Sequence, residues 1–360
     1  MYINIMYITG LELIEAPFNI EQNQLKQVLG KALNLDERNQ RAFNVLYRAT
    51  GIKTRQSVVE DYYRGRSVNF FADEGDRIIF PSTKTRMDLY RKSILEWLIP
   101  SLKKVRDSKF KNVQFTHLIT VSCTGMYAPG LDYDIQYHLN LDPSIFRQSI
   151  NFMGCYAGIS ALRMASDICK GMPDSKVLII DVEMCSLHFQ NSVKHDDLLS
   201  NSLFADGAAM VVVEGANSKN HKLALIDSYE TQTIPESMND MAWEIGDEGF
   251  NMKLSSYVPQ LLGEQLEKFA VCFEKHPTTN YAIHPGGRKI LEAVQKAFGI
   301  SLQQLSHSYD TLEKHGNMSS VTIFYVLKKM ISEGKTGRTF AAAFGPGLTM
   351  EAANMNILAN

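Results

Sequence analysis

Short apolar runs alternate with helical patterns along almost the whole of this chain. The runs most typical of buried strands are residues 117–121, 176–181, 208–213, 223–227, 280–283 and 338–343. Strands that are apolar on both faces, with amphipathic stretches between them, are typical of mixed sheets that helices cover. The pattern therefore predicts a protein of the α/β class.

A polar stretch, 214–221, is the clearest break in this alternation. The order of strands and helices is similar on its two sides, which indicates two related halves, residues 1–216 and 217–360. The first ten residues have no basic segment and no long apolar core, so we expect a strand there rather than a signal peptide. No stretch approaches the roughly 18–20 apolar residues of a membrane span.

Composition and charge narrow the function classes. The 360 residues are 45% hydrophobic and can bury a large core. A net charge of −2 gives no indication of a nucleic-acid partner. The five cysteines are odd in number and include no C-x-x-C pair, which favours a reducing cytoplasm over a disulfide framework or a metal site. We therefore expect a cytoplasmic protein without a bound metal.

Cys155 is the first candidate for chemistry. Gly154 and Gly158 flank it, and a helical pattern begins directly after it. The unpaired N–H groups and the partial positive charge of a helix N-terminus stabilise a thiolate, which is the nucleophilic form of cysteine. A buried cysteine that only fills space is an equal alternative when this segment is considered alone.

Two further segments favour the nucleophile. Residues 281–291 predict a short strand that ends at His284, followed by a Pro-Gly-Gly turn into a helix. Asn317 follows a glycine at the start of an apolar helix, where it also suits the role of a helix cap. Open α/β folds place their chemistry where strands and loops lead into helices. Cysteine, histidine and asparagine together supply a nucleophile, a base and an amide donor.

Five short motifs extend this pattern over most of the chain. They are 154–158 (Gly-Cys-Tyr-Ala-Gly), 203–209 (Leu-Phe-Ala-Asp-Gly-Ala-Ala), 283–287 (Ile-His-Pro-Gly-Gly), 316–320 (Gly-Asn-Met-Ser-Ser) and 344–349 (Phe-Gly-Pro-Gly-Leu-Thr). In order and spacing they resemble the motifs of type III polyketide synthases, the chalcone- and stilbene-synthase-like branch of the thiolase superfamily, in its bacterial form. The resemblance implies a thiolase-like, five-layered αβαβα fold built from two related halves, and a homodimer.

The resemblance also implies a reaction. Malonyl-CoA would undergo iterative decarboxylative Claisen condensation onto an acyl-CoA starter, or onto malonyl-CoA itself, and the product would cyclise to a pyrone or a resorcinol/phloroglucinol-type ring. Cys155 would carry the chain, and His284 and Asn317 would donate hydrogen bonds to the enolate oxygen. His284 would also pair with Cys155 and keep it ionised at rest. The CoA thioesters would be loaded directly, without a carrier protein and without any cofactor.

A gate and a cavity follow from the same resemblance. Phe204 and Met252 would form the gate, with Met252 at a position where the family carries a second aromatic ring. The other expected cavity residues are Cys123, Thr124, Ala128, Cys185, His188, Trp243, Ser319 and Pro346.

The expected cavity residues bear on the product, and a basic turn bears on CoA. The bulk of Trp243 and His188 argues against a large flavonoid product, whereas the small Ala128, Cys123 and Cys185 indicate space for a side tunnel that would hold an acyl chain. Lys53 and Arg55 would bind the CoA phosphates, although a solvated basic turn is an equal alternative.

Three other enzyme classes share parts of this pattern. A β-ketoacyl-acyl-carrier-protein synthase III-like enzyme has the same Cys, His and Asn set, but it usually carries His-Gln-Ala-Asn, whereas this chain has Pro-Gly-Gly after His284. A 3-hydroxy-3-methylglutaryl-CoA synthase would need a general-base glutamate early in the chain, and no glutamate there has the matching sequence context. A papain-like cysteine hydrolase has the three residues in the same order, but the Gly-Cys-Tyr context of Cys155 differs from the papain pattern.

Overall fold

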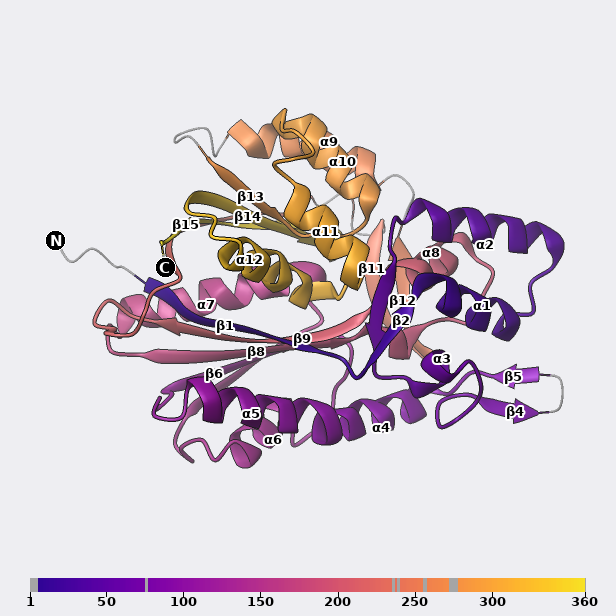
Figure 1. Ribbon diagram of the computed structural model, residues 1–360, viewed down its shortest axis with the longest axis horizontal. Helices are drawn as coiled ribbons and strands as arrows, with labels where there is room; N and C mark the ends of the chain where they lie inside the picture. The colour runs from indigo at the N-terminus through magenta and orange to yellow at the C-terminus, as the bar shows by residue number, and fades with distance from the viewer. Residues whose placement is uncertain are drawn as a thin grey trace.

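A mixed sheet of nine strands runs through the molecule, and helices lie against it in layers (Figure 1). The computed structural model describes residues 6–74, 77–234, 237, 240–254, 258–271 and 278–359. Within these residues the strand order is β13-β14-β15-β10-β1-β9-β8-β6-β7.

Five strands form the first half of the sheet. They are β1 (Met6–Glu15), β9 (Asp206–Glu214), β8 (Lys176–Met184), β6 (His117–Ser122) and β7 (Phe146–Asn151). β6 is parallel to both of its neighbours, whereas β8–β9 and β9–β1 are antiparallel. β9 is buried along its whole length, which explains its unbroken apolar run.

Four strands form the second half. They are β10 (Ala224–Gln232), β15 (Thr349–Ile357), β14 (Gly337–Gly345) and β13 (Asn280–Ile283). β13 and β14 are parallel, and the other pairs are antiparallel. The two halves form one continuous sheet because residues 6–8 of β1 pair with residues 224–226 of β10.

Helices occupy both outer faces and the space between the halves. α7 (Ala157–Gly171) and α12 (Thr322–Ser332) lie between the two halves of the sheet (Figure 1). The outer helices are α4 (Thr83–Ser93), α5 (Ile99–Lys109) and α6 (Leu131–His138) on the first half, and α9 (Val258–Val271), α10 (Arg288–Phe298) and α11 (Ser306–His315) on the second. The expected α/β fold with five αβαβα layers is confirmed.

Alternate residues of the central strands fill different cores. In β8, Leu178 and Ile180 pack in one cluster with α4, α5 and α6, whereas Val177 and Ile179 pack in another with α7 and α12. Successive side chains of a strand point to opposite faces of the sheet. Burial on both faces therefore follows from the layers on either side.

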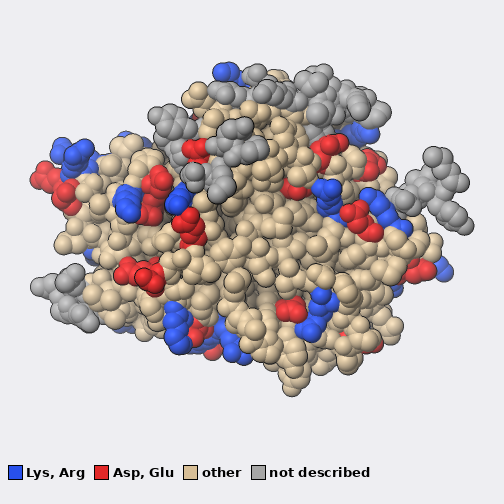
Figure 2. Space-filling view, turned by 180° about the vertical axis from the view of Figure 1, so that it is seen from behind, with Lys and Arg blue, Asp and Glu red and all other residues tan. Residues whose placement is uncertain are grey.

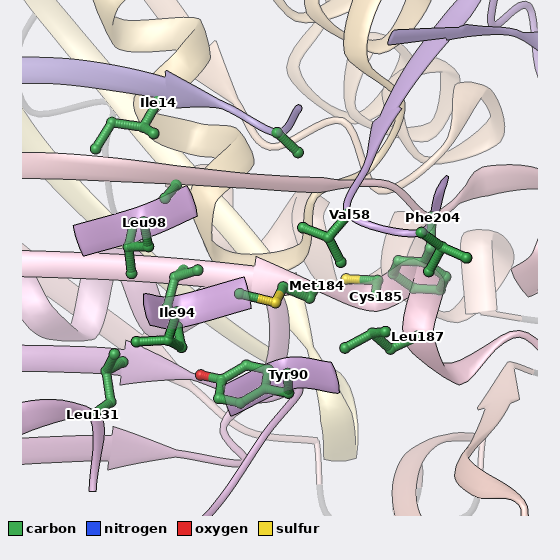
Figure 3. Close-up of a cluster of buried hydrophobic side chains, with 14 of the residues drawn as sticks. Ile14, Val58, Tyr90, Ile94, Leu98, Leu131, Met184, Cys185, Leu187 and Phe204 are labelled. Carbon is green, nitrogen blue, oxygen red and sulfur yellow. The ribbon is translucent and has the colours of Figure 1, made fainter. Parts of the chain in front are cut away.

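The outer core of the first half reaches the end of the sheet where the candidate residues lie. Figure 3 shows this cluster extending from Leu98 past Tyr90 and Met184 to Cys185 and Phe204. One wall of the site described below is therefore continuous with a packed apolar core, which limits its movement.

Smaller elements complete the fold around the site. The hairpin of β11 (Met241–Gly246) and β12 (Gly249–Leu254) places Trp243 opposite Met252. The remaining elements are β2 (Phe18–Glu21), α1 (Gln22–Ala32), α2 (Glu37–Ala49), β3 (Thr54–Ser57), α3 (Glu60–Arg64), β4 (Ala72–Glu74), β5 (Arg77–Ile79), the π-helical turn Ile94–Leu98 and α8 (His195–Leu203).

All six strands expected from the apolar runs are present. The run 223–227 begins as a strand at Ala224, and the run 176–181 continues to Met184. β7 and β15 were not expected, because polar residues interrupt their apolar pattern. The expected N-terminal strand is β1 from Met6 onward, and residues 1–5 lie outside the described residues.

The surface carries charges of both signs. On the face shown in Figure 2, Lys and Arg lie close to Asp and Glu around a broad area without charged side chains. Among the described residues, no helix combines the length and the apolar character needed to cross a membrane.

Candidate active site

Cys155 lies in a tight turn between β7 and α7. It is the middle residue of the 3-10 turn Gly154–Tyr156, which leads directly into the 15-residue helix α7. Gly154 has a φ of 78°, and a Cβ atom there would lie 2.2 Å from Cδ of Pro346. Only glycine fits this turn, so the turn sets the thiol against the Pro346 loop at the N-terminal end of α7.

A cavity of about 310 Å³ opens in front of the thiol, and its walls come from both halves of the chain. The expected site residues that line it are Cys123, Thr124, Cys155, Cys185, Phe204, Trp243, Met252, His284, Asn317, Ser319 and Pro346. The structure therefore brings together residues that are far apart in the sequence.

His284 follows the last residue of β13 and points into this cavity. Its backbone N–H donates to the carbonyl of Ala342 at 2.8 Å, which fixes the end of the strand. The side chain is 1% exposed, and neither ring nitrogen has a hydrogen-bond partner among the described residues. Burial lowers the pKa of His284 to about 3. A buried ring with two unpaired nitrogens is available to a substrate.

Asn317 is held on both sides. Its backbone N–H donates to the carbonyl of Leu203 at 3.0 Å, and its own carbonyl accepts from the N–H of Ala205 at 2.9 Å. The side-chain Nδ2 donates to the carbonyl of Gly286 at 3.1 Å, and Oδ1 accepts from the N–H of Ser319 at 2.9 Å. Asn317 therefore does cap the turn after it, as one reading of the sequence predicts, and the second Nδ2 proton remains for another acceptor.

The thiol of Cys155 has a largely apolar environment. Burial raises the pKa of Cys155 to about 12, and the charge of Glu183 adds to this, whereas hydrogen bonds from Ser319 and Asn317 act in the opposite direction. Burial thus favours a neutral thiol and, in His284, a neutral imidazole. A thiolate and an imidazolium in this cavity therefore require one another, and both charges arise together when the thiol proton moves to the ring.

One cavity wall is made of large side chains that the fold holds in place. The indole Nε1 of Trp243 donates to the carbonyl of Cys123 at 2.8 Å. Met252 lies opposite Trp243 in the hairpin, and the backbone of Phe204 forms an isolated bridge with Asn317. Phe204 and Met252 therefore lie at the cavity as expected of the gate residues.

The structure corrects two of the expected cavity positions. His188 lies behind the wall, because its Nε2 donates to the carbonyl of Thr124 at 2.7 Å and its ring stacks on Phe250 with centroids 4.1 Å apart. Ala128 is exposed and lines a separate surface hollow with Met126. The chain turns outward after Thr124, so Ala128 opens no side tunnel from this cavity.

The structure also corrects the expected CoA-binding pair. Arg55 is 1% exposed, and its guanidinium donates to Oε1 of Gln22 at 2.8 Å and to the carbonyls of Asn201 at 2.9 Å and Phe204 at 2.6 Å. Arg55 therefore stabilises the backbone of the Phe204 segment from the protein interior. Lys53 pairs with Glu313 on the surface and lines a different hollow.

Several lining residues lie outside the set of expected site residues. The exposed lining residues mark the open end of the cavity, and two cations, Arg288 and Lys289, are among them at the first turn of α10. Their place directly after the His-Pro-Gly-Gly turn could have suggested this position. The other lining residues that we did not anticipate are mostly aliphatic: Val45, Leu46, Ala49, Leu199, Leu203, Leu254, Val258 and Leu262. Among the described residues, no three His, Cys, Asp or Glu side chains cluster in a way that could hold a metal ion.

Family comparisons match the chain over most of its length. The model of the chalcone and stilbene synthases matches residues 21–217 with its N-terminal domain and residues 226–358 with its C-terminal domain. A putative chalcone synthase of Bacillus subtilis is 35% identical over 246 residues, which cover 64% of this chain and 67% of that protein.

Two further relatives differ in how much of their own length is matched. The α-pyrone synthesis polyketide synthase-like Pks18 of Mycobacterium tuberculosis is 31% identical over 255 residues, which cover 67% of this chain and 65% of Pks18. The probable polyketide synthase 1 of Dictyostelium discoideum is 30% identical over 264 residues, which cover 69% of this chain but only 8% of that protein.

Solved structures match the fold over nearly every residue. The C-terminal type III polyketide synthase domain of Steely1 from Dictyostelium has a TM-score of 0.89 at 24% identity, and the match covers 99% of this chain and 100% of that domain. The five layers described above are thus a thiolase-like fold.

Proposed function

The chain belongs to the chalcone and stilbene synthase family, the type III polyketide synthases, and from this we propose that it condenses malonyl-CoA onto a CoA-linked starter in repeated decarboxylative Claisen steps. One observation carries the proposal: Cys155, His284 and Asn317 come from three separate segments and line one apolar cavity. The four described cysteines are free, which supports a reducing cytoplasm as the place of the reaction.

Loading of the starter uses Cys155 and His284. The ring of His284 takes the thiol proton, and the thiolate attacks the carbonyl carbon of the acyl-CoA. When the tetrahedral intermediate collapses, CoA leaves as a thiolate and takes the proton from the imidazolium. The acyl group is then a thioester on Cys155, and His284 is neutral again.

Extension uses His284 and Asn317 as hydrogen-bond donors. The carboxylate of malonyl-CoA leaves as CO₂, and the electron pair of the broken bond makes the remaining thioester an enolate. A ring N–H of His284 and the second Nδ2 proton of Asn317 donate to the enolate oxygen. The enolate carbon attacks the acyl group on Cys155, which releases the Cys155 thiolate and leaves the lengthened chain on CoA.

The apolar gate assists the loss of CO₂. Phe204 and Met252 lie at the cavity with few polar atoms around them. A carboxylate is much less stable in such surroundings than the neutral CO₂ it becomes. The gate therefore favours decarboxylation over simple binding of malonyl-CoA, and it keeps water from the enolate.

The starter class follows from the lining. The cavity is small at about 310 Å³, its lining is largely apolar and includes several aliphatic side chains, and Trp243 occupies one wall. We therefore expect a small to medium aliphatic acyl-CoA as starter, with ring closure to a pyrone or a resorcinol/phloroglucinol-type product. The name of the Mycobacterium relative, which refers to α-pyrone synthesis, supports the pyrone. Products from a panel of acyl-CoAs with malonyl-CoA, identified by mass spectrometry without carrier protein, test this assignment.

Arg288 and Lys289 are the cations best placed for the CoA phosphates. Both line the open end of the cavity at the first turn of α10, where helix N–H groups also favour anions. Lys289→Ala is expected to raise KM for malonyl-CoA by about 3- to 10-fold with little change in kcat, because an exposed phosphate contact contributes roughly 1 kcal/mol. Lys53→Ala is the matched control and is expected to leave KM unchanged. The reverse pattern would return the phosphate site to Lys53.

A second copy of the chain is the partner we propose for one apolar face. β7 is an edge strand, and Met126, Tyr133, Tyr137 and Phe146 beside it are each between 46% and 67% exposed. Exposed apolar side chains next to an unpaired strand edge are typical of an interface. Light scattering is therefore expected to give twice the chain mass of 40.6 kDa, and Phe146→Asp is expected to shift the protein to the monomer. A monomeric wild type would contradict this assignment.

A further inference from the structure

Two carboxyl side chains lie side by side beneath the cavity, and the proposed reaction does not use them. Asp181 and Glu183 are two residues apart on β8, so they share a face of the strand, and both are 0% exposed. Ser320, the residue after the cavity residue Ser319, lies between them. Its Oγ is 2.7 Å from Oδ1 of Asp181 and 2.6 Å from Oε1 of Glu183.

The number of protons at Ser320 shows that one carboxyl group is protonated. A serine hydroxyl has a single proton and can donate to only one of the two carboxyl oxygens. If both carboxylates were charged, the other contact would bring two oxygen lone pairs together with no proton between them. One carboxyl group must therefore donate to Ser320 while Ser320 donates to the other.

The remaining hydrogen bonds place that proton on Asp181. Glu183 can accept three hydrogen bonds. One comes from Ser320 to Oε1, and the other two reach Oε2 from the N–H of Cys123 at 3.0 Å and from the hydroxyl of Thr124 at 2.9 Å. Asp181 has one contact, and its Oδ2 has no hydrogen-bond partner among the described residues. Three donors stabilise a charge on Glu183, whereas a charge on Asp181 would be buried with little compensation.

Glu183 connects the segments that build the cavity. Cys123 and Thr124 form one wall, and Sγ of Cys123 accepts from the N–H of Gly154, next to Cys155, at 3.0 Å. Through Ser320, Glu183 also holds the turn that begins at Asn317. We propose that Asp181, Ser320 and Glu183 form a one-proton positioning unit that fixes the Cys123–Thr124 wall and the Asn317 turn relative to Cys155.

The single charge of the unit also matters for the nucleophile that the proposed function assigns to Cys155. Burial is the main cause of the raised pKa of Cys123, Cys155, Cys185 and Tyr90, and the charge of Glu183 raises the pKa of all four further; none of them is a cation. A second negative charge on Asp181 would add to the charge of Glu183 and oppose the thiolate further. The shared proton therefore limits the negative charge beneath Cys155 to one.

Infrared spectroscopy tests the proton directly and does not depend on activity. At neutral pH the wild-type protein is expected to show a C=O band of a protonated carboxyl group that is missing from Asp181→Asn in the difference spectrum. If the band is kept in Asp181→Asn, or if the two spectra do not differ, the proposal is overturned. This result stands even if the chain proves to have no condensing activity, so it separates this inference from the proposed function.

Kinetics test the positioning role through an asymmetry between two conservative variants. The amide of Asp181→Asn can donate to Ser320 as the protonated carboxyl does, so kcat is expected to remain within about twofold of wild type. The amide of Glu183→Gln replaces one of two acceptor oxygens with a donor, so kcat is expected to fall at least about tenfold while KM for malonyl-CoA stays within about twofold. Equal losses in both variants, or an unaffected Glu183→Gln, would overturn the proposal.

Discussion

Cys155→Ala is expected to abolish condensation, because the chain would then have no thiol at the N-terminal end of α7 to hold the acyl group. Release of CO₂ from malonyl-CoA is expected to continue in this variant, since the enolate needs only the donors of His284 and Asn317. Product formation and CO₂ release are measured in the same reaction. CO₂ release without product formation is therefore expected in this variant, and in no variant of His284 or Asn317.

Cys169→Ala is the matched control for this experiment. Cys169 is also a buried free cysteine, but it packs between α7 and the sheet, away from the cavity. Mass analysis of the wild-type protein after incubation with an acyl-CoA is expected to locate the acyl group on Cys155 alone. An adduct on Cys123 or Cys185, with Cys155 unmodified, would contradict the assignment of the nucleophile.

Loss of either enolate donor has the second large effect. Asn317→Ala and His284→Ala are each expected to reduce decarboxylation of malonyl-CoA by about 10²–10³-fold, or ~3–4 kcal/mol. Loading distinguishes the two variants. Asn317→Ala keeps the base for the thiol and is expected to acylate Cys155 normally, whereas His284→Ala is expected to acylate Cys155 slowly, because the buried thiol would then have no proton acceptor.

Asn317→Asp tests the hydrogen-bond donor role of residue 317 separately from its capping role. An aspartate can still accept from the N–H of Ser319, as Oδ1 of Asn317 does at 2.9 Å, but it offers no side-chain N–H. Asn317→Asp is therefore expected to lose decarboxylation as Asn317→Ala does, while its Tm falls less. If Asn317→Ala retained decarboxylation close to the wild-type rate, the residue would be a cap and not a donor.

The catalytic candidates that could be predicted from the sequence are those whose positions depend on local backbone geometry. The position of Gly154 favours glycine because its φ is 78°, and the turn it makes places Cys155 at a helix start. His284 at a strand end and Asn317 beside a helix start are equally local features. Their meeting in one cavity depends on the order of strands in the sheet, which the resemblance supplied and the apolar pattern alone did not.

Positions that depend on the direction of one side chain were harder to predict. His188 and Cys185 are the two ends of the 3-10 turn Cys185–His188, yet Cys185 lines the cavity and the His188 ring turns away to Thr124 and Phe250. Arg55 has the composition of an exposed turn around it, but it lies in β3, where three of the four residues are buried. The residue type alone does not show which way such a side chain points. Its direction depends on which backbone carbonyls the fold places within reach of it.

The paired acids on β8 are visible in the sequence, but their partner is not. An Asp and a Glu two residues apart, in a strand that is otherwise apolar, share one buried face and therefore need partners. The strand itself was predicted correctly, and its burial pattern confirms that both acids lie in the interior. Ser320 supplies the missing link, but it comes from a segment 137 residues away, which no local pattern indicates.

Turnover of isotopically labelled malonyl-CoA with a small aliphatic acyl-CoA, without any carrier protein, tests directly whether this protein is a condensing enzyme. The purified protein is expected to release CO₂ and free CoA and to form a labelled pyrone or resorcinol/phloroglucinol-type product, and Cys155→Ala is expected to form no product. A wild-type protein that releases no CO₂ from malonyl-CoA, or that forms product only when an acyl carrier protein is added, would contradict the proposed function.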